Sequence, residues 1–236
     1  MSVGGFPNSR RAFLAGAVGG ARGMGHVVLL GDSVFDNGAY VGGGPDVAAQ
    51  LRGRLPEVAG WRVTCLAVDG ALIGGVRSQL ARLPGDASLL VVSAGGNDAL
   101  GYAAVLQERA GTVAEAVGRL ADVRGRFWRD YRAMLDLVLA AGVMAAVCTV
   151  YDGRLPEPRG RLAVTALCVL NDCITREAFA RGLPLLDLRL VCAEDADYAN
   201  PIEPSVRGGA KIAAAIAALT AGQVPAQGRS EVFARG

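Results

Sequence analysis

The chain has 236 residues, of which 52% are hydrophobic and 19% are charged, a balance that excludes disorder for most of its length. The 24 basic and 22 acidic residues are interleaved and give a net charge of +2, so no basic stripe predicts a nucleic-acid partner. No apolar run approaches the ~20 residues of a membrane span. A small neutral or weakly charged substrate fits this composition best, and oligomeric state is left open.

Residues 1–23 are interpreted as a flexible N-terminal extension or a weak export signal. Residues 9–14 read Ser-Arg-Arg-Ala-Phe-Leu, which resembles a twin-arginine signal, and a short apolar stretch follows before Arg22. Met24 is an alternative start. We therefore expect a cytoplasmic protein, with export through a signal at residues 9–21 as the alternative. The five cysteines include no Cys-x-x-Cys pair and predict free, mostly buried thiols in a reducing compartment.

Short apolar runs alternate with longer segments of helical periodicity from residue 24 to residue 222. This alternation predicts one α/β domain, a doubly wound three-layer α/β/α fold around a five-stranded parallel sheet. The predicted strands are residues 27–30, 63–68, 89–93, 143–150 and 185–188. The predicted helices are residues 47–55, 77–83, 128–141, 162–181 and 209–221, with residues 99–127 also expected to be helical. Residues 223–236 are predicted to be a flexible tail.

Residues that can carry chemistry follow three of these strands, at the sheet edge where functional groups collect. The first strand ends in Gly31-Asp32-Ser33, and a serine on a tight turn can present its hydroxyl and backbone N–H to a carbonyl, although Gly-Asp-Ser is also ordinary turn chemistry. The third strand leads to Asn97, whose amide can donate to an oxyanion. The second leads to Gly70 and Gly74, where backbone N–H groups can approach a ligand closely.

Together, these three turns resemble the motifs of the SGNH (GDSL-type) hydrolase family of esterases, lipases and deacetylases, over residues 26–218. The resemblance implies a flavodoxin-like fold with Ser33 as the nucleophile. It also implies oxyanion donors from the backbone of Ser33, from Gly74 or Gly70, and from Asn97. The expected partner is a small-molecule ester or acylated substrate, and no cofactor or metal is implied.

The fourth motif of the family departs from its usual form, Asp-x-x-His-Pro-Ser-x-x-Gly. The motif is kept at Pro204, Ser205 and Gly208, but Asn200 stands where the family has aspartate and Glu203 where it has histidine. The lone histidine, His26, precedes Ser33 by seven residues on a strand, on the order of 20 Å at ~3.3 Å per residue. It cannot reach Ser33 within one subunit, and we expect a capping or partly exposed strand-end residue.

Two roles for Glu203 stay open. As a general base it would be weaker than histidine, because the pKa values of ~4.3 and ~6.5 differ by about two units, and Asn200 would hold its carboxylate by a hydrogen bond. Alternatively, Glu203 caps the helix that follows Ser205, near the positive end of the helix dipole. The chain is accordingly either a serine hydrolase of an ester or O-acyl bond, or an inactive binding protein of the same fold that recognises a carbonyl or carboxylate.

Other acidic residues are expected to be structural. Asp36 and Asp98 lie beside the candidate turns and are predicted to fix loop geometry through backbone hydrogen bonds. Glu194, Asp195 and Asp197 form an acidic cluster, but no histidine or cysteine is spaced to complete a metal site. We therefore expect this cluster to be a solvated loop.

Overall fold

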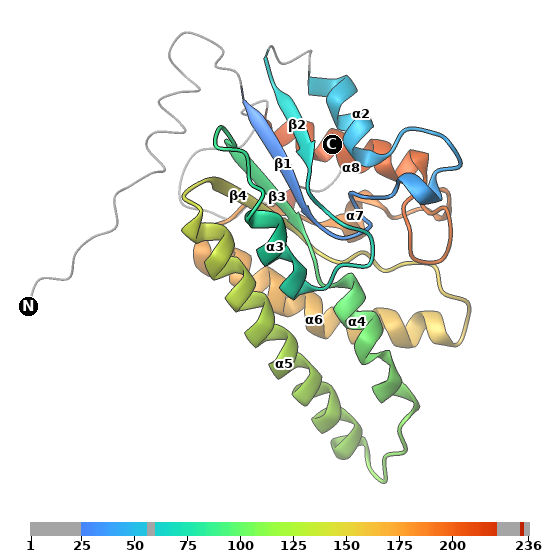
Figure 1. Ribbon diagram of the computed structural model, residues 1–236. Coiled ribbons are helices and arrows are strands. Elements are labelled where there is room, and N and C mark those ends of the chain that lie inside the picture. Colours follow the sequence, from blue (N-terminus) through green and yellow to red (C-terminus); the bar gives the residue numbers. More distant parts are fainter. Residues whose placement is uncertain (1–24, 56–59, 221–231, 234–236) are drawn as a thin grey trace, which may run out of the picture.

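A parallel β-sheet lies between two layers of helices in the computed structural model, which describes residues 25–55, 60–220 and 232–233 (Figure 1). The strand order is β2-β1-β3-β4-β5-β6, and every neighbouring pair is parallel. This architecture confirms the predicted doubly wound α/β fold. The strands are β1 (His26–Gly31), β2 (Arg62–Cys65), β3 (Leu89–Ser93), β4 (Met144–Cys148), β5 (Leu185–Leu186) and β6 (Val232–Phe233).

The sheet has one strand more than the sequence predicts. Val232–Phe233 lies inside the segment expected to be a flexible tail, yet it pairs in parallel with β5. The prediction of five strands is therefore incomplete at this edge. The proposed N-terminal extension, the alternative start at Met24 and the rest of the tail lie outside the described residues.

Apolar side chains from successive residues of the central strands enter opposite layers. In β1, Val27 and Leu29 pack with one cluster of buried residues, and Val28 and Leu30 pack with another. This alternation follows from the period of two in a strand, and a strand buried on both faces reads as a continuous apolar run. The first layer holds α2 (Val47–Arg54), α7 (Leu188–Val191) and α8 (Val206–Thr220), and the second holds α3 (Val76–Leu80), α5 (Val113–Ala140) and α6 (Arg159–Arg181).

The long segment before β4 is mostly helical, as predicted, but it is divided. It contains α4 (Gly96–Tyr102), the 3₁₀ turn η4 (Ala103–Gln107) and then α5. Thr112 caps the N-terminus of α5, because its side-chain hydroxyl accepts a hydrogen bond from the Glu115 N–H. Gly182 ends α6 with φ of +62°, the left-handed conformation in which glycine commonly terminates a helix. Other 3₁₀ turns are η1 (Gly38–Tyr40), η3 (Ile73–Gly75) and η5 (Asp195–Asp197). Within the described ranges, no helix combines the length and apolarity needed to cross a membrane.

Candidate active site

The turn after β1 is held by its neighbours so that Ser33 lies at the carboxyl edge of the sheet. Gly31 has φ of +126°, and a Cβ there would stand 1.6 Å from the Ser93 carbonyl oxygen, so only glycine fits. The Gln79 side chain accepts from the Gly31 N–H at 2.7 Å and donates to its carbonyl at 2.8 Å. The Asp32 N–H donates to Ser93 O at 3.1 Å, which ties the turn to β3.

Ser33 and Glu203, which are 170 residues apart in the sequence, meet in this turn. The Ser33 Oγ donates to Glu203 Oε1 at 3.0 Å, and both residues are buried. The other carboxylate oxygen, Oε2, is also buried and has no hydrogen-bond partner within the described part of the chain. The Glu203 carboxylate therefore has one direct polar contact here, and that contact is the hydroxyl of the candidate nucleophile.

The loop that carries Glu203 is fixed mainly through its backbone. The Asn37 side chain donates to Pro204 O at 3.1 Å and accepts from the Val47 N–H, so it joins this loop to the start of α2. The Tyr151 hydroxyl donates to Ile202 O at 2.6 Å. Neither residue is predicted from the sequence. Asn37 lies four residues after Ser33 and Tyr151 three residues after β4, and these places at the sheet edge are the only signal that could have found them.

The expected role of Asn200 is not the observed one. Its Oδ1 accepts from the Ile202 N–H at 2.9 Å and the Glu203 N–H at 3.0 Å, so Asn200 holds the backbone of the loop and not the carboxylate. This is the local side-chain to backbone turn that asparagine favours. The capping alternative for Glu203 also differs from the structure, because the Ser205 Oγ accepts from the Gly208 N–H in the first turn of α8.

The candidate oxyanion donors lie around the same turn. The Ser33 N–H has no acceptor within the described residues, and Asn97 lines the same cavity as Ser33. One Asn97 amide proton is used, because Nδ2 donates to Ala71 O at 3.1 Å, and this bond ties Asn97 to the turn after β2. Gly70 has φ of +76° in that turn, but neither Gly70 nor Gly74 lines the cavity.

Two carboxyl groups at the site, those of Asp32 and Glu203, have pKa values above the usual range. Burial raises the pKa of Asp32 to about 7, and the nearby Glu203 carboxylate adds to the rise, while a hydrogen bond from the Val34 N–H opposes it. Burial also raises the pKa of Glu203, the hydrogen bond from Ser33 opposes that rise, and the charge of Asp69 adds to it. Both groups therefore hold a proton more strongly than free carboxyl groups do.

The other acidic residues have structural partners. As predicted, Asp36 accepts from the Asp69 N–H at 2.9 Å and Asp98 accepts from the Ile73 N–H at 2.9 Å. The prediction of a solvated acidic loop is wrong for Asp197, which is fully buried and bonded to Lys211 Nζ at 2.7 Å. No cluster suited to a metal ion occurs within residues 25–55, 60–220 and 232–233.

His26 lies at the beginning of β1, at the other end of the strand from Ser33. Its Nδ1 pairs with Asp86 at 2.9 Å and its Nε2 with Thr64 at 2.7 Å, and the residue is buried. It is therefore a satisfied structural histidine, and the expectation of partial exposure is wrong. The five cysteines are free, and three of them, Cys148, Cys173 and Cys192, are buried, as predicted.

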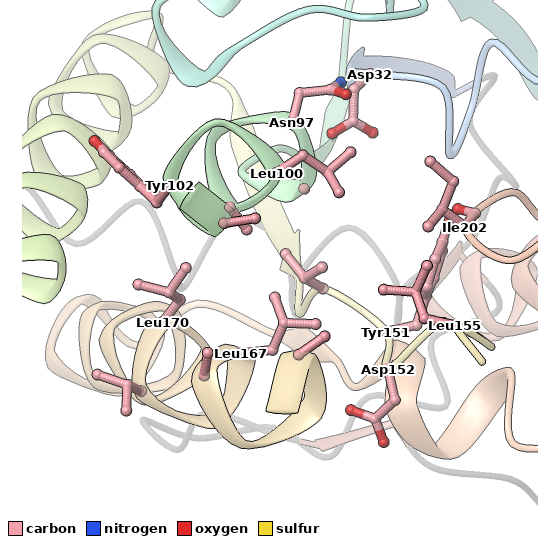
Figure 2. Close-up of a pocket in the computed structure, with 18 of the residues that line it drawn as sticks. Asp32, Asn97, Leu100, Tyr102, Tyr151, Asp152, Leu155, Leu167, Leu170 and Ile202 are labelled. Atoms are coloured by element: carbon pink, nitrogen blue, oxygen red, sulfur yellow. The ribbon is translucent and has the colours of Figure 1, made fainter. Parts of the chain in front are cut away.

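A cavity of about 140 Å³ opens at Ser33, Asn97 and Glu203 and continues between α4 and α6. Figure 2 shows Asp32 and Asn97 at one side, Leu167 and Leu170 from α6 at the other, and Tyr151, Leu155 and Ile202 along a third. Asp32, Ser33, Asn97 and Glu203 supply polar groups on the Ser33 side. The walls beyond are mostly aliphatic, and Tyr102 and Asp152 also line them. The cavity thus joins the polar surroundings of Ser33 to an apolar space.

Residues 29–210 match the model of the GDSL-like lipase/acylhydrolase family. Among solved structures, the chain is similar to an extracellular lipase from Streptomyces rimosus, with 20% identity and a TM-score of 0.58 over 79% of this chain and 95% of that one. It is also similar to a phospholipase A1 from Streptomyces albidoflavus, with 18% identity and a TM-score of 0.58 over 80% and 96%.

A third similar structure is an acetylxylan esterase from Geobacillus stearothermophilus, with 20% identity and a TM-score of 0.52 over 84% and 94% of the two chains. At these identities the structural matches establish a shared fold. No curated protein sequence gives a significant match.

Proposed function

Since the chain belongs to the GDSL-like lipase/acylhydrolase family, we propose that it cleaves an ester or O-acyl bond with Ser33 as nucleophile and Glu203 as its general base. The hydrogen bond of 3.0 Å from Ser33 Oγ to Glu203 Oε1 is the observation that carries this proposal. A nucleophile within hydrogen-bond reach of a base is the arrangement that covalent catalysis requires.

The reaction proceeds through an acyl-enzyme. Ser33 Oγ attacks the substrate carbonyl carbon, and its proton passes to Glu203 Oε1. The charge on the carbonyl oxygen is stabilised by the Ser33 N–H and the Asn97 amide, both at the cavity, whereas Gly70 and Gly74 do not line it. The ester C–O bond then breaks, and the departing alcohol oxygen takes the proton from Glu203. Water then attacks the acyl carbon and gives a proton to Glu203. Glu203 passes this proton to Ser33 Oγ as the bond between Ser33 and the acyl group breaks and the acid leaves.

A carboxylate base is weaker than histidine by roughly 3 kcal/mol of proton affinity when both groups are unperturbed. Burial of Glu203 recovers part of this difference, because it raises the pKa of the carboxyl group. The single hydrogen bond to the carboxylate also keeps its basicity directed at Ser33. We therefore expect slower turnover than with a histidine base, but turnover that depends on Glu203.

The test compares Ser33→Ala and Glu203→Gln with the wild type on an aryl acetate, together with labelling by a fluorophosphonate probe. Glu203→Gln keeps the shape of the side chain but removes the proton acceptor, so kcat/KM should fall by about 10²–10⁴. Glu157→Gln, at an exposed position, is the matched control and should retain wild-type activity. A wild type that neither turns over the ester nor labels at Ser33 would instead be a carbonyl-binding protein of this fold.

A further inference from the structure

We infer that the cavity beside Ser33 is an acyl-chain site that selects linear aliphatic acyl groups of about six carbon atoms, an inference that rests on the proposed hydrolase function. The cavity extends from the reaction centre between α4 with η4 on one side and α6 on the other. Its walls there are aliphatic, from Leu100, Ala103, Leu106, Ala163, Ala166 and Leu167.

These walls determine which kind of group can occupy the cavity. These six residues present methyl and methylene groups and no side-chain hydrogen-bond partner, so a sugar hydroxyl buried against them would lose its hydrogen bonds to water without replacement. Tyr102 and Asp152 also line the cavity beyond the Ser33 turn and carry polar side-chain groups. A hydrocarbon chain loses nothing of this kind and gains from the removal of its surface from water. The chemistry of the walls therefore favours an alkyl chain over a polar substituent.

The acyl side of the ester fits the cavity better than the alcohol side. The acyl group stays covalently attached to Ser33 through the first half of the reaction, whereas the alcohol must leave before water can attack. An alcohol enclosed between α4 and α6 would delay that exchange. The half-exposed side chain of Leu100 lies at the rim, where the outer end of a longer chain can pass into solvent.

The volume of the cavity determines the length of acyl chain that we expect it to hold. The cavity measures about 140 Å³, and an apolar cavity of about 150 Å³ in another protein accommodates benzene, which has six carbon atoms. Each methylene group transferred from water into the cavity should raise kcat/KM about fourfold, which corresponds to ~0.8 kcal/mol. Beyond about six carbon atoms, further methylene groups meet solvent, so the increase should stop.

The experiment measures kcat/KM for p-nitrophenyl esters from acetyl to decanoyl, with alkyl acetates of increasing alcohol length as a parallel series. We expect a rise of about fourfold per methylene to hexanoyl and then a plateau, with little dependence on alcohol length. Ala166→Leu adds three carbon atoms to the cavity wall and should move the plateau to about three carbon atoms, and Leu167→Ala should move it to longer chains. Ala180→Leu, at an exposed position of the same helix, is the control and should leave the profile unchanged.

A binding series separates this inference from the proposed function. Linear alkyl methyl ketones carry a carbonyl but no leaving group, and their affinity can be measured with or without turnover. Length-dependent ketone binding in a protein that cleaves no ester would support the acyl site and overturn the hydrolase proposal. Three results would overturn the acyl site. Ester cleavage could be independent of acyl-chain length, or it could depend on the length of the alcohol instead. The third result is a chain-length profile that neither Ala166→Leu nor Leu167→Ala changes.

Discussion

Asp32→Asn should stabilise the protein at alkaline pH and not at acid pH. Asp32 is buried beside Ser33, and burial, with repulsion from Glu203 and Asp98, raises its pKa to about 7 from 3.8. In the unfolded chain the group titrates near the lower value. Between these two pH values the folded protein binds the proton and the unfolded chain does not, so the free energy of unfolding falls as pH rises.

The size of the effect follows from the two pKa values. They differ by about three units at ~1.4 kcal/mol each, so the ionised Asp32 lowers stability by roughly 4 kcal/mol at pH 8. Asparagine cannot ionise, and its Oδ1 can still accept from the Val34 N–H, as Asp32 does at 3.2 Å. For a chain of this size, the expected gain in Tm at pH 8 is on the order of 10 °C, and the gain at pH 4 is close to zero.

Urea unfolding of wild type and Asp32→Asn at pH 4 and pH 8 is the direct assay. The two proteins share every other titrating group, so the difference between them reports Asp32 together with its repulsion of Glu203 and Asp98. Asp122→Asn, which removes an exposed carboxylate on α5, serves as the control and should give the same small difference at both pH values. A stability difference for Asp32→Asn that is independent of pH, or a loss of stability at pH 8, would refute the reasoning.

Three further predictions concern the reaction. Asn97→Ala should lower kcat/KM by about 10²–10³, with a change of only ~1 kcal/mol in the free energy of unfolding from the lost bond to Ala71, and unchanged turnover would remove Asn97 from the site. The kcat/KM of the wild type should rise with pH through one pKa above the usual glutamate range, because only ionised Glu203 accepts a proton; a flat profile would contradict this. Glu203→His should retain or raise activity and move that rise toward ~6.5, and Asn200→Asp in addition should raise it further. Equal rates for the single and double variants would show that position 200 does not orient the ring.

Most of the strands, and the turns that carry Ser33 and Asn97, can be predicted from the sequence because they depend on local signals. Strands buried on two faces are continuous apolar runs, so β1 and β3 are identified within a residue of their ends. The carboxyl ends of parallel strands share one edge, which brings the turn of Ser33 toward Asn97. The contact between Ser33 and Glu203 follows from the family frame and not from periodicity, since 170 residues separate them.

The remaining features depend on contacts that no local pattern encodes. Val232–Phe233 is too short to show a period, so its pairing with β5 could not be predicted. Asn200 bonds to the backbone two and three residues ahead, a local preference of asparagine that competes with the expected contact to the carboxylate. The cavity depends on how α4 and α6 pack across the sheet edge, which is set by the fold as a whole.

The partners of the buried carboxylates explain why Glu203 is suited to act as a base. Five acidic side chains are buried within the described residues, and three of them, Glu177, Asp187 and Asp197, form ion pairs with arginine or lysine. At Asp187 the hydrogen bonds and charge of Arg189 outweigh burial and lower the pKa, which makes that carboxylate a poor base.

Asp32 and Glu203 have no ion pair with any described arginine or lysine, and both have raised pKa values. They are also the two buried carboxyl groups that flank Ser33, one as its sequence neighbour and the other through the 3.0 Å hydrogen bond. A fold that needed these groups only for stability would be better served by a cation partner or a neutral side chain, because an unpaired buried charge is unfavourable. Glu203, the carboxylate that the proposed reaction uses as a base, is therefore left without a cation that would lower its pKa.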